Sequence, residues 1–241
     1  MKTLRALLIL SFSIFLFNTN KVSAENSSAS TAMNSETAGP SSSAMKNTII
    51  GVLILASTIS LFLIFERGLA LRRSIIIPSR IVELQGVCES QDDLLKLRTT
   101  TNEIQSPYSQ LIACAIDHLH LSREENTEML QTRARVEVAK MERGIVILEI
   151  ITGIAPLLGL VGTIFGLITL FQGMGVEASA EQTALFSKGI SIALKATLLG
   201  LVVAIPSLIG WSYFNRKVEI LAIEMENLCD QFLHKQYRKN V

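Results

Sequence analysis

The stretch that decides the fold is Gly144–Phe171, GIVILEIITGIAPLLGLVGTIFGLITLF, in which Glu149 is the only charged residue. A helix of this length rises about 40 Å, more than the roughly 30 Å hydrocarbon core of a bilayer. Two further apolar segments have similar character: residues 47–65 carry no charge, and residues 189–214 carry only Lys195. The sequence therefore predicts an all-α membrane protein with three transmembrane helices.

The composition agrees with this interpretation. Of the 241 residues, 49% are hydrophobic and 18% are charged, whereas a typical soluble domain has about 25% charged residues. The net charge is only +1, so the chain has no overall field that attracts nucleic acid. An ordinary soluble enzyme and a nucleic-acid-binding protein are both disfavoured.

A shorter apolar block, Ala6–Phe17, lies near the start of the chain after Lys2 and Arg5, and is followed by Val22-Ser-Ala24. Its twelve residues rise about 18 Å as a helix, too little to cross a bilayer. A positive start, a short apolar region and small residues at the exit are typical of a cleaved secretory signal peptide. A short uncleaved anchor is the alternative.

The basic residues indicate the orientation of the helices. Residues 66–143 hold eleven Lys and Arg and residues 215–241 hold five, whereas residues 25–46 and 172–188 hold one each. The basic excess is expected in the cytoplasm, with the N-terminus outside. The predicted order is signal peptide 1–24, disordered periplasmic extension 25–46, transmembrane helix 47–65, cytoplasmic helical region 66–143, transmembrane helix 144–171, periplasmic loop 172–188, transmembrane helix 189–214 and cytoplasmic C-terminal helix 215–241. The disorder follows from the Ser-, Ala- and Thr-rich composition of the extension.

The cytoplasmic region is expected to be a helical bundle. Residues 110–143 contain no Gly and no Pro, which favours one long helix. We expect this helix to run directly into the second span. Residues 215–241 are expected to continue the third span. His118 and His120 are two positions apart and would not share a helix face. The cysteines Cys88, Cys114 and Cys229 match no metal-binding spacing, so no metal or cofactor is predicted.

Small residues gather on one face of each of the last two spans. The second span carries Thr152, Ala155, Gly159, Gly162, Thr163 and Gly166, and the third carries Ala193, Ala196, Thr197, Gly200, Ala204 and Ser207. Such faces let helix backbones approach closely in lipid. Packing seams alone would explain the glycines and alanines, but would not require both threonines.

The depths of the two threonines sharpen this point. With Gln172 and Gly189 as level outer ends, Thr163 lies about 13 Å deep and Thr197 about 12 Å. Two hydroxyls at one depth can line a polar track or solvate an acid supplied by another helix. Glu149 lies on the face of Thr163, nearer the cytoplasm, either as the end of that track or because it is near the interface. Lys195 is expected on the opposite face, where it snorkels outward.

Two of these stretches resemble the signatures of a known family. The runs APLLGLVGTIFGLI (155–168) and GISIALKATLLGLVVAIP (189–206) resemble the second- and third-helix motifs of the ExbB/TolQ/MotA proton-channel family, and KMERG (140–144) is similar to the family's approach to the second helix. The resemblance covers about residues 47–235. Three spans with a large loop match ExbB and TolQ rather than four-span MotA, and the signal peptide with its exported extension favours an ExbB-like member.

The resemblance implies a subunit of the bacterial inner membrane that uses proton motive force and is not an enzyme; the spans also contain no histidine and no hydrolase motif. Its implied partners are further copies in a homopentamer, an ExbD-like single-span protein whose Asp is protonatable, a TonB-like protein and membrane lipid. Thr163 and Thr197 match the ring threonines of the family. Together with Glu149, which helical periodicity places on the face of Thr163, they make up the predicted ion pathway. The predicted helix-packing residues are Gly159, Gly162, Gly166, Ala193, Gly200 and Pro206.

One position departs from the family pattern. Ile192 stands where the third-helix motif commonly has Glu. Three alternatives stay open: the partner's Asp suffices, Glu149 substitutes for the missing carboxylate from the other end, or this variant conducts differently. Two other roles stay open: a TolQ-like stator for envelope maintenance, and a membrane scaffold that does not conduct.

Overall fold

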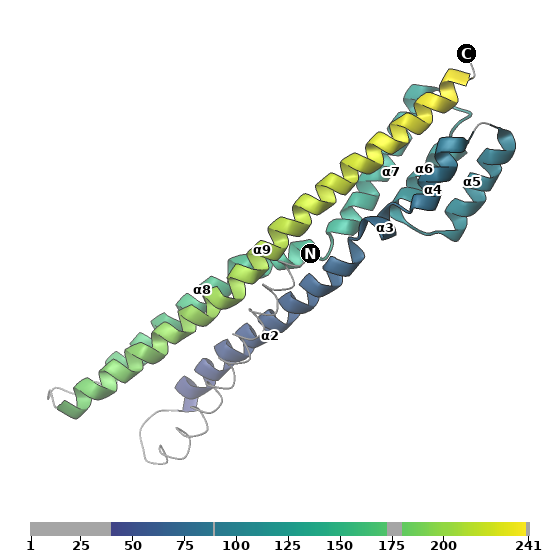
Figure 1. Ribbon diagram of the computed structural model, residues 1–241. Helices are drawn as coiled ribbons and strands as arrows, with labels where there is room; N and C mark the ends of the chain where they lie inside the picture. Colours follow the sequence, from purple (N-terminus) through teal and green to yellow (C-terminus); the bar gives the residue numbers. More distant parts are fainter. Residues whose placement is uncertain (1–39, 89, 173–179, 240–241) are drawn as a thin grey trace. The chain divides into compact units, whose positions relative to one another are not determined.

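The computed structural model describes residues 40–88, 90–172 and 180–239, and this part of the chain is helical with no strand (Figure 1). The helices are α2 (Pro40–Ala70), α3 (Arg73–Ile76), α4 (Ser79–Val87), α5 (Gln91–Glu103), α6 (Pro107–Asp117), α7 (Arg123–Glu142), α8 (Ile145–Gln172) and α9 (Ala180–Lys239). The predicted signal peptide, residues 25–39 of the extension and residues 173–179 of the loop lie outside the described residues.

Three of the described helices are long and apolar enough to cross a membrane: Thr48–Ala70 in α2, Ile145–Ile168 in α8 and a segment that begins at Gly189 in α9. This confirms the prediction of three such helices. The helices that contain the first and third of these segments begin earlier than the predicted spans, because α2 starts at Pro40 and α9 starts at Ala180. Which ends of these helices face the cytoplasm and which face the periplasm stays a prediction.

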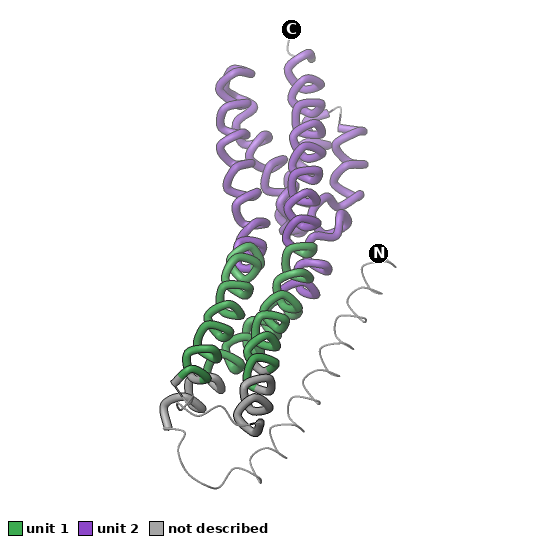
Figure 2. Tube along the Cα trace, turned by 90° about the vertical axis from the view of Figure 1, so that its left-hand side faces the viewer, with its two compact units in different colours: residues 1–62, 148–210 green, residues 63–147, 211–241 purple. Residues whose placement is uncertain are grey.

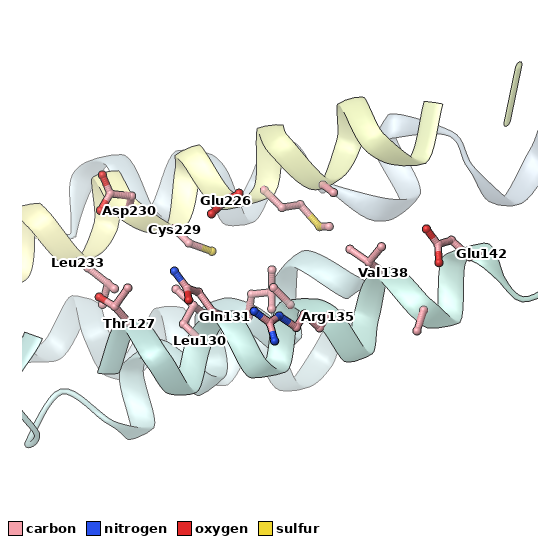
Figure 3. Close-up of a pocket in the computed structure, with 15 residues that line it drawn as sticks. Thr127, Leu130, Gln131, Arg135, Val138, Glu142, Glu226, Cys229, Asp230 and Leu233 are labelled. Atoms are coloured by element: carbon pink, nitrogen blue, oxygen red, sulfur yellow. The ribbon is translucent and has the colours of Figure 1, made fainter. Parts of the chain in front are cut away.

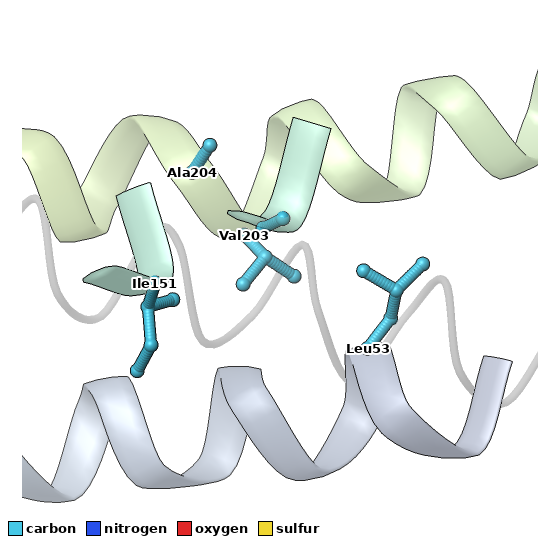
Figure 4. Packing of buried hydrophobic residues seen from close by; sticks show 5 residues of the cluster. Leu53, Ile151, Val203 and Ala204 are labelled. Atoms are coloured by element: carbon cyan, nitrogen blue, oxygen red, sulfur yellow. The ribbon is translucent and has the colours of Figure 1, made fainter. Parts of the chain in front are cut away.

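The chain divides into two compact units, coloured separately in Figure 2. Of the described residues, unit 1 comprises 40–62, 148–172 and 180–210. Its core is a cluster of buried side chains from all three long helices, Leu53, Ile151, Ala155, Val203 and Ala204 (Figure 4). The outward faces of these helices are apolar as well, with Phe62 67% and Leu157 61% exposed. A helix that is apolar all round is expected in lipid.

Unit 2 comprises Leu63–Ile147 and Trp211–Val241. Its largest buried side chains are Tyr108, Phe214 and Phe232. The Tyr108 hydroxyl donates to Gln85 Oε1, and Gln85 Nε2 donates to the Leu228 carbonyl at 2.7 Å. This buried chain of hydrogen bonds joins α4, α6 and α9. Charged residues of unit 2 also form ion pairs. Arg98, for example, donates two hydrogen bonds of 2.8 Å to Asp117.

Serine side chains start three of the short helices of unit 2. Ser90, Ser106 and Ser122 each accept a hydrogen bond from the backbone of the residue three positions later, and the side chain of that residue accepts one in return. These capping boxes satisfy backbone donors that a helix start leaves unpaired. They fix where α5, α6 and α7 begin.

The prediction of one helix over residues 110–143 is wrong, because α6 ends at Asp117 and α7 begins at Arg123. Two interactions explain the break: Ser122 caps α7, and the Tyr237 hydroxyl donates to the carbonyls of Leu121 at 3.0 Å and of His118 at 3.5 Å. His118 and His120 lie in this connection rather than in a helix, and their rings stack with centroids 6.2 Å apart.

The helix also does not run directly into the second span, because α7 ends at Glu142 and α8 begins at Ile145. Gly144 lies in the turn between them. A Cβ placed on Gly144 would be 2.7 Å from Cζ of Arg67, whose guanidinium also donates to the Met141 carbonyl at 3.4 Å. The arginine thus binds the end of α7, and the glycine leaves room for it. The continuation of the third span as one helix to Lys239 is confirmed.

Unit 2 also contains a groove of about 590 Å³ that is lined by α7 and by residues 222–233 of α9, with Leu111 of α6 (Figure 3). Apolar side chains such as Leu130 and Met225 line it, and Arg135, Glu226 and Asp230 bring charge to it. Among the described residues, no group of three or more His, Cys, Asp or Glu side chains is arranged so that it could hold a metal ion.

Candidate functional site: a hydroxyl pair between two apolar helices

The small-residue faces of α8 and α9 pack against each other in unit 1. A Cβ placed on Gly166 would be 2.9 Å from the Ala193 Cβ, and one placed on Gly162 would be 2.8 Å from the Ala196 Cβ. Real Cβ atoms essentially never lie so close to their neighbours. Glycine at these positions therefore sets how closely the antiparallel helices approach.

The closest approach lies one turn further along. A Cβ on Gly159 would be 2.9 Å from the Ala196 carbonyl oxygen, and one on Gly200 would be 2.6 Å from the Ala155 carbonyl oxygen. The obstacle here is backbone rather than a flexible side chain, so neither helix can yield locally. Pro206 lies inside α9, half-buried, six residues beyond this contact.

Thr163 and Thr197 meet at this contact. Thr163 Oγ1 donates to the Gly159 carbonyl at 3.0 Å, Thr197 Oγ1 lies 3.2 Å from the same carbonyl oxygen, and the two hydroxyls hydrogen-bond to each other. Both side chains are half-buried. The two hydroxyls therefore meet at one level along the pair of helices, in agreement with the residue count from the helix ends.

The Thr163 and Thr197 hydroxyls and the Gly159 carbonyl form a hydrogen-bonded group that we call the hydroxyl node. The number of protons in this node determines which groups it can bind. Each hydroxyl has a single proton, and the Gly159 carbonyl and the neighbouring hydroxyl oxygen accept both protons within the node. Lone pairs are what remains for an outside group. The node therefore suits a hydrogen-bond donor, such as a protonated carboxyl group, water or hydronium, better than an ionised carboxylate.

The structure does not bring the other predicted residues to this node. Glu149 is exposed and lies fourteen residues before Thr163, about 21 Å along α8. Lys195 is exposed on α9, whereas its neighbours Ala193 and Ala196 face α8. The side chain of Ile192 lies outside the described part of the chain. The roles of Glu149 and of the two threonines in an ion pathway stay predictions.

A second polar contact escaped the sequence analysis. The Ser60 and Ser207 hydroxyls are 2.6 Å apart, both residues are buried, and Ser207 Oγ also donates to the Val203 carbonyl at 2.8 Å. This contact joins α2 to α9. The available signal was a pair of serines, Ser57 and Ser60, within an otherwise apolar segment, but that pattern does not identify a partner.

The fold and the site together define a helical membrane protein with three apolar helices and hydroxyl groups buried at their contacts. The model of the MotA/TolQ/ExbB proton channel family matches residues 103–227, just over half of the chain. This chain therefore belongs to that family, and the resemblance of the helix motifs is confirmed.

Individual relatives agree with the family match. The chain is 34% identical over 117 residues to a putative biopolymer transport protein ExbB homolog of Methanothermobacter thermautotrophicus, a match that covers 48% of this chain and 41% of that protein. It is 40% identical over 82 residues to the biopolymer transport protein ExbB of Helicobacter pylori, covering 34% and 56%. It is 27% identical over 201 residues to the Tol-Pal system protein TolQ of Pseudomonas aeruginosa, covering 78% and 85%. The chain thus matches about half the length of the first two relatives.

Proposed function

We propose that this protein is a proton-channel and stator subunit of a bacterial inner membrane. In this proposal it couples proton motive force to TonB-dependent transport across the outer membrane, with an ExbD-like single-span partner and a TonB-like protein. The subunits form a homopentamer, with the N-terminus in the periplasm, and residues 66–143 and 215–241 in the cytoplasm. Family membership and the three apolar helices support the proposal.

The hydroxyl node is the observation that carries the mechanism. A carboxyl group on a partner helix is most stable in its neutral form at this depth, because burial in an apolar medium disfavours the charged form. A neutral carboxyl has a proton to donate, and Thr163 and Thr197 have lone pairs to receive it. The node would thus hold the partner's acid in its protonated state between proton uptake and release. Glu149 would serve the cytoplasmic end of the same pathway.

Replacing either threonine with valine tests this role. Valine keeps the shape of threonine but removes the hydroxyl, so Thr163→Val and Thr197→Val should each reduce proton-driven uptake about tenfold, the equivalent of one strong hydrogen bond. The assay is uptake by cells that lack their own ExbB-type protein and co-express this chain with its ExbD-like partner. Protein levels are measured in parallel.

Thr152→Val is the matched control. Thr152 lies on α8 as Thr163 does, and its hydroxyl likewise donates to a carbonyl of its own helix, that of Leu148 at 2.8 Å. Thr163 differs because its hydroxyl also hydrogen-bonds to Thr197 on α9. Thr152→Val should retain normal uptake. If Thr163→Val and Thr197→Val also retain normal uptake at normal levels, the threonines have no part in the mechanism.

A TolQ-like role is the second candidate, and the match to TolQ over 78% of this chain favours it. Complementation separates the two functions. An ExbB-type subunit restores uptake through TonB-dependent transporters, whereas a TolQ-type subunit restores the integrity of the outer membrane. A scaffold that does not conduct, suggested by Ile192, would restore no proton-dependent activity with either partner set.

A further inference from the structure

The joint between α7 and α8 is a break that the local sequence does not require. Only Arg143 and Gly144 separate the two helices. Helices commonly end at a left-handed residue or before a proline. Residues 139–148 contain no proline, Arg143 has the right-handed helical angles φ −47° and ψ −41°, and the backbone of Gly144 is not left-handed. A contact from outside the two helices therefore explains the break better than the sequence of the joint does.

The Met141 carbonyl receives such a contact. In one continuous helix this carbonyl would accept the N–H of Ile145, four residues later. In the structure, Nη1 of Arg67 donates to it at 3.4 Å, and Arg67 lies on α2. A side chain that enters the hydrogen-bond ladder of a helix is a recognised cause of a kink. Arg67 and the Ile145 N–H are thus alternative partners of one carbonyl.

Gly144 provides the space that the Arg67 guanidinium occupies. A Cβ placed on Gly144 would be 2.7 Å from Cζ of Arg67 and 2.8 Å from Nη2. The obstacle is the end of a flexible side chain rather than backbone, so an alanine fits here once the guanidinium moves away. The contact therefore depends on two residues, and each can be changed while the other is kept.

The environment of Arg67 favours the break in one respect and opposes it in another. Its positive charge lies at the carboxyl end of α7, where the helix dipole stabilises a cation. Its side chain, however, is only 18% exposed, and Nε has no hydrogen-bond partner among the described residues, although Glu66 Oε2 lies 3.1 Å away. A buried N–H without a partner costs free energy, as do the unpaired backbone groups at two helix ends. Contributions that oppose each other in this way allow two arrangements of the joint.

We propose that Arg67 is a latch. While it binds the Met141 carbonyl, α7 and α8 are separate helices; when it leaves, the Ile145 N–H takes its place and residues 123–172 form one helix. A continuous helix transmits movement along its length, whereas an interrupted one bends at the break. The latch would thus control whether a movement of α7 reaches Thr163 on α8. It is separate from the hydroxyl node, and its test does not depend on proton conduction or on partner proteins.

Hydrogen–deuterium exchange of the full-length chain in detergent, resolved to single residues, tests the latch. The first N–H groups of a helix have no partner within it, so the amides of residues 145–147 gain hydrogen bonds only when α7 and α8 join. Arg67→Met removes the guanidinium and should slow exchange at these amides about fivefold, the equivalent of one hydrogen bond each. Gly144→Ala keeps the arginine but displaces its guanidinium, and should slow exchange at least as much, because alanine also favours the helix.

Each variant has a matched control. Arg73→Met removes a guanidinium six residues further along, where Nε donates to Glu224 at 2.9 Å instead of to α7. Gly153→Ala improves the helix propensity of α8 at a position where a Cβ meets nothing within 4 Å. Both should leave exchange at residues 145–147 within twofold of the wild type. Circular dichroism checks that every variant is folded, and if Arg67→Met is not, Gly144→Ala still provides the test.

Three results would overturn the proposal. Unchanged or faster exchange in folded Arg67→Met would show that Arg67 only caps the end of α7 and does not compete with the helix. Equal slowing in Arg73→Met would show a general effect of lost charge. Equal slowing in Gly153→Ala would show that helix propensity, rather than release of Arg67, joins the two helices.

Discussion

The two units of the chain use different chemistry to hold their helices together. In unit 1, α8 and α9 approach through glycine and alanine until the backbone of one helix touches the other, and the side-chain hydrogen bonds between helices involve hydroxyl groups. In unit 2, large side chains such as Tyr108 and Phe214 are buried, and capping boxes and ion pairs complete the structure. In water, the hydrophobic effect drives apolar helices together, but in lipid this driving force is absent. Unit 1 must therefore gain its stability from closeness of packing.

The largest expected effect comes from filling the closest contact in unit 1. Gly200→Val places a branched side chain against the Ala155 carbonyl oxygen, which lies only 2.6 Å from the position of a Cβ. Because the obstacle is backbone, we expect a loss of about 3 kcal/mol in the free energy of unfolding, at the upper end for an overpacked core. Thermal unfolding in detergent measures this change.

Gly153→Val is the control for that change. Gly153 lies on α8, and a Cβ there would meet nothing within 4 Å. Valine in an open helical position should cost nothing and can even help, since glycine is the poorer helix former. If the two variants lose equal stability, closeness of the backbones is not what holds unit 1 together.

In unit 2 the corresponding weak point is a buried hydrogen bond rather than a backbone contact. Tyr108→Phe removes the donor to Gln85 Oε1 while keeping the ring. A buried acceptor without a partner costs about 1–3 kcal/mol, and near-ultraviolet circular dichroism during thermal unfolding reports this loss. Tyr213→Phe, at a 41% exposed position, should change stability by less than about 0.5 kcal/mol. An equally small effect at Tyr108 would contradict the assigned role of the Gln85 network.

The same tyrosine predicts a dependence on pH. Burial, with a smaller contribution from Cys229, raises the pKa of Tyr108 well above its usual value. Above about pH 10 the unfolded chain loses this proton while the folded chain keeps it, so stability should fall as the pH rises. The expected slope is up to about 1.4 kcal/mol per pH unit. Tyr108→Phe should lack this part of the slope, and identical pH profiles for the two proteins would show that Tyr108 does not contribute.

The sequence predicts contacts within unit 1 better than those within unit 2. The meeting of Thr163 with Thr197 follows from helical periodicity and from equal distances to the helix ends, because two antiparallel helices leave few other arrangements. The break between α6 and α7 depends on Tyr237, which is remote in sequence. The S-x-x-E pattern of Ser122 and Glu125 was a visible local signal for the start of α7.

Other features required the third dimension. Gly144 permits the approach of Arg67 from α2, and no spacing within the chain pairs these two residues. The ion pair of Arg73 with Glu224 likewise arises only when α3 lies beside α9. Sequence periodicity identifies the face of a helix, but it does not identify which charge or hydroxyl on a distant segment that face will meet.

The smallest expected effect provides the sharpest contrast between the units. Ser60→Ala removes a buried hydroxyl that hydrogen-bonds to Ser207 at 2.6 Å, so by geometry it resembles Tyr108→Phe. Hydrogen bonds between membrane helices nevertheless average about 0.6 kcal/mol, because a helix separated within the membrane finds other partners. Thr58→Val is the control, since this exposed hydroxyl donates to the Ile54 carbonyl of its own helix. Unfolding in detergent should place Ser60→Ala just below the wild type and Thr58→Val level with it. A loss as large as that of Tyr108→Phe would mean that a polar contact, rather than close packing, holds α2 in unit 1.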